Sequence, residues 1–368
     1  MNEELKYTDF KVVEIHGRYV TNAYIENFLQ QLPASFHLNV LGESVNGKPI
    51  YGLTIGTGPE RILMWSQMHG NESTTTKAVL DLLNYLKLEL TESKNIFQNF
   101  TLQIIPILNP DGAKAYTRVN ANEIDLNRDA QNQSQPESKI LRLAYENFKP
   151  DYCFNLHDQR TIFNVGQTSK PATVSFLAPA FDEGRNLSES RIKSMRLIAA
   201  MNNRLQQQIP GQVGKYDDGF NANCVGDFFQ MLHTPTILFE AGHFSKDYER
   251  EMTRKYIFTA LLEALISISQ GKLENFSVED YQAIPENQKM YCDVLVKNAH
   301  LLDADLESGA KVAILFQELL QEGIIVFKPA IDKKNISVAS LFGHEIKDVG
   351  IIKDRLWLKE CGITSLFK

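Results

Sequence analysis

His69 and Glu72 are the residues of this chain whose types and spacing first suggest chemistry. A histidine and a carboxylate at positions i and i+3 lie on the same side of one turn, close enough to share a cation. The spacing alone is a weak signal, because eight histidines give roughly an even chance of one such pair. Residues 61–65 predict a buried strand, and residues 75–90 predict a helix with an apolar face. The pair therefore lies at the carboxyl end of a strand, where open α/β sheets bind ligands.

His157 offers a third ligand for a cation at this site. It follows residues 152–156, which predict another strand. Two histidines and one glutamate, with a fourth position left open, form the ligand arrangement of a catalytic zinc. The alternative is a lone histidine that hydrogen-bonds locally at a strand end.

Glu240 follows the apolar strand predicted at residues 236–239. A charge at the rim of a buried strand is costly unless it is paired or functional. As a functional group, Glu240 would take a proton from a water and pass it to a leaving amine. The alternative is a structural salt bridge, with His243 as the nearby partner.

Two arginine-containing segments complete the set of candidate residues. Arg118 near the cation would stabilise a developing oxyanion, whereas an isolated loop arginine is more commonly solvated. Arg128 offers a planar fork for a carboxylate, and Asn127 adds a donor beside it. Asp125 would accept the second N–H of a ligand histidine and so fix its tautomer. Taken alone, residues 125–128 are an ordinary polar loop.

The elements that must position these residues alternate along the chain. Strands are predicted at 36–40, 50–55 and 101–108, a turn at 109–112, and helices at 22–32, 137–148, 187–208 and 248–269. This order predicts an α/β fold with a mixed, largely parallel sheet and helices on both faces. Residues 271–289 are polar and predict a linker, and four short apolar runs after residue 290 predict a small β-rich domain. We therefore expect a catalytic domain at 1–272 and an accessory domain at 285–368.

Composition narrows the classes of partner. The chain has 368 residues, a net charge of −7 and no concentrated block of Lys and Arg, which argues against nucleic acid as a partner. No stretch is long enough to span a bilayer, and the first six residues lack a signal-peptide pattern. Four scattered cysteines fit reduced thiols. These features predict a cytoplasmic protein that does not bind a membrane.

The candidate segments, taken in order, resemble the carboxypeptidase A-like zinc metallopeptidase family. The resemblance spans roughly residues 40–270 and rests on segments 41–50, 68–72, 109–112, 118–120, 124–128, 155–157 and 239–240. It implies one Zn²⁺ on His69, Glu72 and His157. It also implies Glu240 as general base with a zinc-activated water, and Arg118 as the residue that polarises the carbonyl.

The same resemblance implies that Asn127 and Arg128 hold the terminal carboxylate of the substrate, and that Asp125 supports a ligand histidine. Family members usually carry a loop tyrosine some twenty residues before the general base. Here Phe220 stands near that position, and Tyr216 is the closest tyrosine. Tyr216 is therefore the candidate substrate-binding tyrosine of this chain.

Three hypotheses follow for the function. The first is a zinc metallocarboxypeptidase that hydrolyses a peptide or amide bond next to a free carboxylate. The second is an N-acyl amino acid deacylase similar to succinylglutamate desuccinylase and aspartoacylase, which share the His-x-x-Glu and Asp-Leu-Asn-Arg pattern and can carry a C-terminal β domain. The third is a non-catalytic peptide-binding protein. The complete set of candidate residues favours an enzyme, and the Asn-Pro-Asp-Gly and Arg-x-Asn context favours the peptidase.

Overall fold

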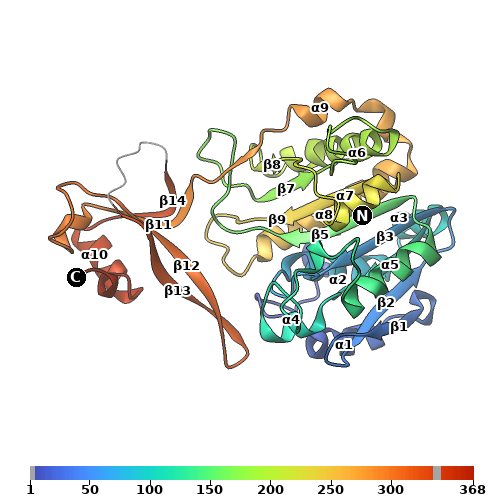
Figure 1. Ribbon diagram of the computed structural model, residues 1–368, viewed down its shortest axis with the longest axis horizontal. Coiled ribbons are helices and arrows are strands. Elements are labelled where there is room, and N and C mark those ends of the chain that lie inside the picture. The colour runs from blue at the N-terminus through green and yellow to red at the C-terminus, as the bar shows by residue number, and fades with distance from the viewer. Residues whose placement is uncertain (1–4, 335–340) are drawn as a thin grey trace.

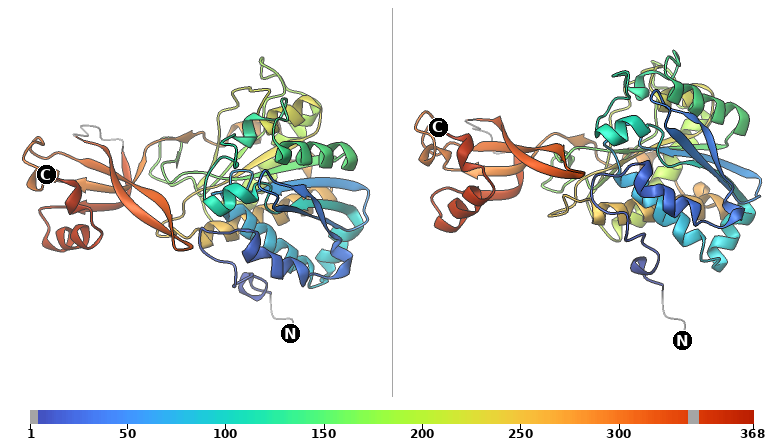
Figure 2. Two further views of the ribbon diagram at one scale, coloured as in Figure 1. Left: turned by 60° about the horizontal axis from the view of Figure 1, so that its bottom comes forward. Right: turned by 90° about the horizontal axis from the view of Figure 1, so that it is seen from below.

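A computed structural model describes residues 5–334 and 341–368. Residues 1–4, which begin the segment searched above for a signal pattern, lie outside this range. Figure 1 shows a larger α/β part and a smaller, separate β-rich part at the C-terminal end. The two views of Figure 2 show the same separation from other sides. The predicted fold class is confirmed.

The larger part is built on one eight-stranded sheet with the order β1-β2-β4-β3-β5-β9-β7-β8. The neighbouring strands β4, β3, β5 and β9 run parallel to one another. Antiparallel pairs lie on either side of this parallel centre. The elements of this part are α1 (Asn22–Gln30), β1 (Leu38–Glu43), β2 (Pro49–Ile55), β3 (Glu60–Ser66), α2 (Thr74–Leu86), α3 (Thr91–Asn99), β4 (Phe100–Ile105), α4 (Pro110–Ala115), α5 (Pro136–Phe148), β5 (Tyr152–Asp158), β6 (Asn164–Val165), β7 (Val174–Leu177), α6 (Glu189–Gln206), β8 (Val213–Lys215), α7 (Val225–Met231), β9 (Thr236–Ala241), α8 (Glu251–Ser269), α9 (Val278–Gln282) and β10 (Asn287–Gln288).

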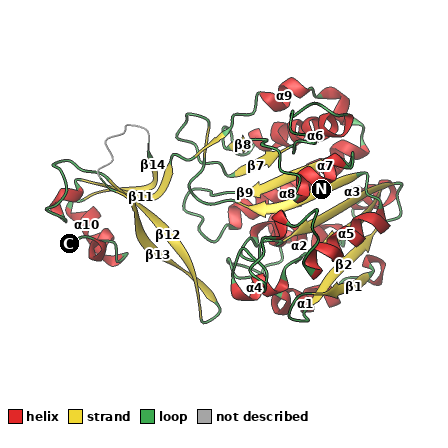
Figure 3. Cartoon of the chain, viewed as in Figure 1, coloured by secondary structure: helices red, strands yellow, loops and turns green. Residues whose placement is uncertain are grey.

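Helices cover both faces of this sheet, as Figure 3 shows. Strand β3 explains why, because it alternates between two cores. Ile62 and Met64 pack into the core that contains α2 and α8, whereas Leu63 and Trp65 pack into the core that contains α5 and α7. A strand buried on both faces is a continuous apolar run in the sequence, as residues 62–65 are. The parallel centre of the sheet is therefore packed on both faces, and the carboxyl ends of its strands can position the side chains of a site.

The C-terminal part forms a four-stranded sheet with the order β13-β12-β11-β14. Its elements are β11 (Tyr291–Lys297), β12 (Val312–Gln321), β13 (Ile324–Lys333), β14 (Phe342–Asp348) and α10 (Ile352–Glu360). Strands β12 and β13 form a long antiparallel hairpin that reaches back toward the larger part (Figure 1). The division into domains 1–272 and 285–368 stays a prediction, because sheet membership alone does not show that either part folds by itself.

Several predicted elements are wrong in type or extent. Residues 109–112 begin helix α4 instead of forming an isolated turn, since the Asn109 side chain caps that helix by accepting a hydrogen bond from the Gly112 N–H at 2.8 Å. The predicted helix 75–90 ends at Leu86, and the apolar run 349–352 leads into helix α10 instead of forming a strand. The predicted linker 271–289 contains α9 and β10, and it buries Tyr281 and Ile284 in the main core.

Two further observations concern the composition arguments. All four cysteines are free thiols. Within residues 5–334 and 341–368, no helix combines the length and apolar character needed to cross a membrane.

Candidate metal centre and active-site pocket

Sheet register places the third candidate ligand beside the candidate base. His157 and Glu240 are directly paired positions on the parallel strands β5 and β9. Residues paired in this way point to the same face of the sheet. Both side chains lie within their strands, near the carboxyl ends, and not after the strands as predicted.

The loop between β3 and α2 carries the other two ligands. Gln67 holds an unfavourable left-handed backbone conformation with φ of 47°. Its side chain stabilises that conformation by donating to the carbonyl oxygens of Val20 at 2.9 Å and Gly70 at 2.8 Å. Gly70 lies so close to helix α4 that a Cβ there would fall 1.9 Å from the Gly112 carbonyl carbon. The sharp turn of this loop directs His69 and Glu72 toward β5.

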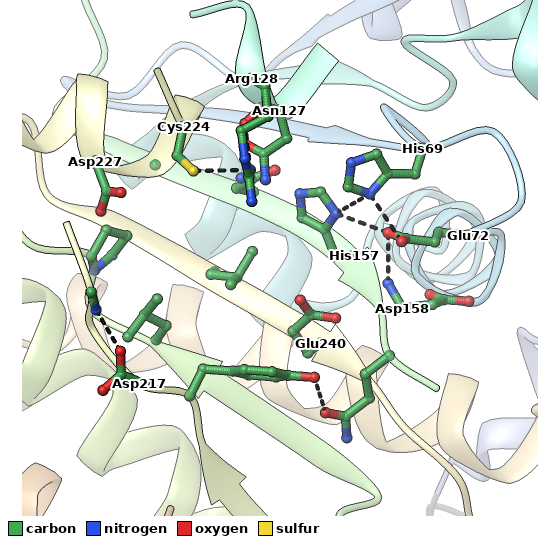
Figure 4. Close-up of a pocket in the computed structure, with 18 of the residues that line it drawn as sticks. His69, Glu72, Asn127, Arg128, His157, Asp158, Asp217, Cys224, Asp227 and Glu240 are labelled. Carbon is green, nitrogen blue, oxygen red and sulfur yellow. Dashed lines mark hydrogen bonds and ion pairs between the residues drawn. The ribbon is translucent and has the colours of Figure 1, made fainter. Parts of the chain in front are cut away.

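His69, Glu72 and His157 form a compact, buried group, and their ligand atoms all lie within 4.8 Å of one another. The Nδ1 atoms of the two histidines are 3.0 Å apart. Glu72 Oε1 lies 2.9 Å from His69 Nδ1, and Glu72 Oε2 lies 2.8 Å from His157 Nδ1. A tetrahedral zinc with Zn–N bonds of about 2.0–2.1 Å needs its nitrogen ligands about 3.3 Å apart. The two nitrogens and one carboxylate therefore fit one zinc ion (Figure 4).

Burial and the close contacts among His69, Glu72 and His157 shift the pKa values of all three residues. Burial opposes the charged form of Glu72, but the two histidines outweigh burial and lower the pKa of its carboxyl. Burial likewise opposes protonation of His69, yet Glu72 and Asp125 raise its pKa above the usual value. Burial dominates at His157 and lowers its pKa, which keeps that imidazole neutral and able to bind a metal.

Asp125 and Arg118 lie around this group. Asp125 Oδ1 is 3.0 Å from His69 Nε2, which places the ring proton on Nε2 and leaves Nδ1 as the ligand atom. The Arg118 guanidinium contacts Asp125 Oδ2 at 3.1 Å and Glu72 Oε1 at 3.4 Å. Its side chain remains 49% exposed, so the rest of its donors are available to a bound molecule.

Glu240 faces the same space without a protein partner. Its Oε2 atom is buried and has no hydrogen-bond partner among the described residues. Burial, together with the charges of Glu72 and Asp158, raises its pKa well above the usual value. Both ring nitrogens of His243 are also buried without a hydrogen-bond partner among the described residues, so the salt bridge named above as an alternative is not supported.

One pocket brings the candidate residues together. It encloses about 1100 Å³, including its open mouth. Its lining includes His69, Glu72, Arg118, Asn127, Arg128, His157, Tyr216 and Glu240. Asp125 is absent from the lining and reaches the site only through its contacts with His69 and Arg118.

Asn127 and Arg128 lie beside Cys224, and His157 stands between them and Glu72 (Figure 4). They belong to the short 3₁₀ turn Leu126–Arg128, which the Asp125 side chain caps by accepting from the Asn127 N–H at 2.9 Å. Asn127 Oδ1 accepts from the Val225 N–H at 3.0 Å, which leaves the amide NH₂ group free to donate into the pocket. Arg128 is exposed, and its Nη1 atom donates to the Asn127 carbonyl oxygen at 2.7 Å and to the Cys224 sulfur at 3.0 Å.

Tyr216 also lines the pocket, whereas Phe220 does not. The Tyr216 hydroxyl donates to Gln159 Oε1 at 2.7 Å. Burial and the nearby charge of Glu240 raise the pKa of this hydroxyl, so it stays protonated. This placement supports Tyr216 over Phe220 as the aromatic residue that contacts a bound molecule.

The sequence reasoning missed Asp158, Gln159 and Asp227, which line the pocket as well. Asp158 accepts hydrogen bonds from the N–H groups of Thr74 and Thr75 at the start of α2, and its own N–H donates to Glu72 Oε2 at 3.1 Å. Its position directly after His157 was the signal that pointed to it. Asp227 lies in helix α7, and no spacing in the sequence connects it to the site.

Comparison with known proteins agrees with this geometry. Residues 21–150 match the sequence pattern described as zinc carboxypeptidase. Over this stretch the chain is similar to zinc carboxypeptidases. The matched stretch contains His69, Glu72, Arg118 and residues 125–128, but it ends before His157 and Glu240. In the structure, strands β5 and β9 bring His157 and Glu240 into the same pocket as His69 and Glu72.

Curated relatives are similar to this chain over short stretches. Carboxypeptidase SOL1 of Arabidopsis thaliana is 31% identical over 144 residues, which cover 36% of this chain and 29% of the relative. Gamma-D-glutamyl-L-diamino acid endopeptidase 1 of Lysinibacillus sphaericus is 34% identical over 93 residues, covering 23% of this chain and 22% of the relative. The chain thus spans less than a third of the length of these relatives.

Solved structures extend the likeness of fold. The carboxypeptidase A of Helicoverpa armigera superposes with a TM-score of 0.55 at 17% identity, covering 70% of this chain and 74% of that one. A metallo-carboxypeptidase of Burkholderia cenocepacia superposes with a TM-score of 0.52 at 19% identity, covering 68% of each chain. At these identities the likeness shows a shared carboxypeptidase fold.

Proposed function

We propose that this protein is a zinc metallocarboxypeptidase, which hydrolyses a peptide or amide bond next to a free carboxylate. The proposal rests on one pocket that brings three features together. These are the group of His69, Glu72 and His157, which we call the metal group, the unpartnered Glu240 carboxylate and the exposed Arg128 guanidinium. Bound zinc would polarise a carbonyl group and lower the pKa of a water toward neutrality. His69, Glu72 and His157 would hold it.

Residues of the chain account for the rest of the reaction. Glu240 takes a proton from the attacking water at its unpartnered carboxylate and passes it to the nitrogen of the leaving amine, which leaves as a free amino acid. Arg118 donates to the carbonyl oxygen as negative charge develops there. Both groups face the same space as the metal group.

Other residues of the same pocket would recognise the substrate. The Arg128 guanidinium and the free amide NH₂ of Asn127 bind the terminal carboxylate, because a planar fork matches the two carboxylate oxygens. Tyr216 adds its ring and a hydroxyl oxygen that can accept a hydrogen bond, because its one proton is donated to Gln159 Oε1. The substrate is thus a peptide whose last residue lies between Arg128 and the metal group.

An N-acyl amino acid deacylase remains the second candidate, since the same fork would hold the carboxylate of an acylated amino acid. The named relative from Lysinibacillus sphaericus adds one substrate to be tested, a γ-D-glutamyl-diamino acid peptide. A mixed library of free peptides, γ-glutamyl peptides and N-acyl amino acids separates these possibilities.

The test is mass spectrometry of the products formed from this library by the zinc-loaded chain. We expect loss of single C-terminal residues from peptides, abolished by a chelator and restored by zinc. Peptides with an amidated C terminus are the matched control and should react far more slowly, because the arginine fork then has no carboxylate to bind. Turnover of N-acyl amino acids alone would favour the deacylase, and no turnover of any member would refute both candidates.

A further inference from the structure

The pocket continues past the metal group into a second hollow. The second hollow shares Glu72, Arg118, Asp158, Gln159 and Arg160 with the first, so the two form one groove. The residues found only in the second hollow include Phe316, Gln317 and Glu318 of strand β12. The C-terminal part therefore supplies one wall of the groove, which we call the hairpin wall (residues 316–318).

The hairpin wall is fixed to the larger part by buried polar contacts. Glu318 pairs with the buried Arg18 guanidinium at 3.0 Å and accepts a hydrogen bond from the Tyr116 hydroxyl. The loop between β3 and α2, which carries His69 and Glu72, is called the metal loop. The Arg18 backbone is hydrogen-bonded to the end of this loop, because its carbonyl oxygen accepts from the Ser73 hydroxyl at 2.6 Å. These contacts hold β12 at a set position relative to Glu72.

A second set of contacts holds the base of the hairpin. The Tyr248 hydroxyl and the Phe316 N–H both donate to the Asp293 carboxylate, at 2.9 and 2.8 Å. The Tyr248 ring also packs against Phe316 and Phe327, with ring centroids 5.3 Å away in each case. The hairpin wall is thus fixed at both of its ends, by the contacts of Glu318 and by those of Phe316.

The direction of a bound substrate follows from the proposed function, on which this inference rests. Arg128 and Asn127 line only the first hollow. If they hold the terminal carboxylate and the scissile bond lies at the metal group, the chain that precedes this bond must leave through the second hollow. The residue before the scissile bond then lies between residues 158–160 and the hairpin wall.

Charge indicates what that residue carries. Arg18, Glu72 and Asp158 are buried, and both carboxylate oxygens of Glu318 are engaged. Arg160 is exposed, lines both hollows and has no ion pair or side-chain hydrogen bond among the described residues. Arg160 therefore gives the second hollow an accessible positive charge that no described protein group neutralises.

We propose that the hairpin wall forms an acyl-side subsite and that Arg160 selects substrates with a carboxylate on the residue before the scissile bond. An acidic side chain at that position pairs with the Arg160 guanidinium while its backbone runs along Gln317. A lysine at the same position faces a like charge and is disfavoured.

The test compares three N-acetylated dipeptides that share one C-terminal residue accepted by the wild type and carry Glu, Gln or Lys before it. We expect kcat/KM for the Glu substrate to exceed that for the Gln substrate by about threefold to tenfold. Arg160→Ala should bring this ratio to about one, whereas Arg160→Lys should retain part of the preference. Gln317→Glu should also reduce the ratio, because it places a negative charge on the hairpin wall, and Gln317→Ala is its neutral control.

Binding provides a readout that does not depend on turnover. Calorimetry on the zinc-loaded Glu240→Gln variant should show tighter binding of the Glu dipeptide than of the Gln dipeptide, and Arg160→Ala should remove the difference. Arg204→Ala, which removes an exposed arginine outside both hollows, should change neither measurement.

The outcomes separate this proposal from the proposed function. Cleavage of all three dipeptides with equal kcat/KM, unaffected by Arg160→Ala, overturns the acyl-side subsite and leaves the carboxypeptidase intact. A preference that depends on Arg160 but does not respond to Gln317→Glu overturns the role of the hairpin wall. A zinc-loaded wild type that cleaves no substrate overturns the proposed function itself.

Discussion

At the scale of single residues, the site depends on pairs of side chains that hold each other in place. His69 is oriented by Asp125 on one ring nitrogen and faces Glu72 with the other. Glu240 has no such partner, and its Oε2 atom is buried without a hydrogen bond in the described part of the chain. A buried polar atom without a protein partner is costly in the resting fold, and it indicates a group kept for an external molecule.

Glu240→Gln removes the proton acceptor while keeping the shape of the side chain. We expect kcat to fall by about a hundredfold to ten-thousandfold, because general-base catalysis contributes on this order. Zinc content and thermal unfolding should stay near the wild-type values, since Glu240 makes no contact that holds the metal group. Steady-state kinetics with metal analysis checks this, and the exposed Glu307→Gln serves as the matched control. Unaltered kcat in Glu240→Gln would exclude Glu240 as the base.

Asp227 makes a prediction about stability and pH. Burial raises the pKa of its carboxyl from 3.8 to about 6. The folded state thus binds the proton more tightly than the unfolded state, so ionisation of Asp227 costs stability as the pH rises from 3.8 to about 6. Asp227→Asn should therefore raise the free energy of unfolding at pH 7 by at most about 3 kcal/mol. The gain should be small at pH 4 and vanish below about pH 3, where both states are protonated.

Chemical denaturation of metal-free protein at pH 4, 5, 6 and 7 measures this gain. Asp332→Asn is the matched control, because it removes an exposed carboxylate by the same substitution. A gain for Asp227→Asn that is the same at every pH would show that packing, and not ionisation, is responsible.

At the scale of elements, the turn from β3 into α2 decides whether the ligands meet. Its left-handed residue, Gln67, is held by three side-chain hydrogen bonds, to Val20, Gly70 and Thr76. Helix α4 packs directly against the same turn, and Asn109 donates to the Met68 carbonyl oxygen at 3.1 Å. The Asn-Pro-Asp-Gly segment is therefore a support for the metal loop as well as a helix start.

Gly70→Ala tests this support. The added Cβ would meet the backbone of Gly112 at 1.9 Å, which neither element can accommodate without moving. We expect a loss of about 3 kcal/mol or more in the free energy of unfolding, together with weaker zinc retention, because His69 adjoins the displaced residue. Gly350→Ala is the control, since the nearest atom there belongs to the flexible Asp348 side chain at 3.2 Å. Equal zinc retention in both variants would contradict the close packing of the loop on α4.

At the scale of the whole molecule, the two parts of the chain are joined close to the site. The Arg18 side chain is 4% exposed and its partner Glu318 is 26% exposed. Burial opposes the charge of Glu318, but Arg18 and Tyr116 outweigh it and lower the pKa of the Glu318 carboxyl. The C-terminal part is thus tied to the larger part by an ion pair and not only by the covalent chain.

Glu318→Ala leaves the buried Arg18 charge without its partner. Breaking a buried pair in this way costs about 3–5 kcal/mol. Glu189→Ala, which breaks the exposed Lys193–Glu189 pair, should cost no more than about 1 kcal/mol. Denaturation at neutral pH compares the two, and a cost for Glu318→Ala as small as that for Glu189→Ala would show that the pair does not fasten the parts together.

The helices and strands of the larger part were largely predictable, because apolar periodicity is a local property. The errors arose where a local signal depends on contacts outside the segment. Asn109 to Gly112 suggested a turn, yet packing against Gly70 lets these residues start α4. Residues 271–289 suggested a linker because they are polar on average, and only the structure shows Tyr281 buried in the main core.

The sequence by itself determined the chemical types at the site and their order along the chain, since side-chain identity needs no fold. It therefore predicted the zinc ligands, the candidate base and the arginine fork. Only the tertiary structure decided their geometry, because the register of β5 against β9 sets His157 beside Glu240, although the two are 83 positions apart in the sequence. It alone also placed the hairpin wall and Arg160 on one groove, since contacts between distant segments leave no periodic trace in a sequence.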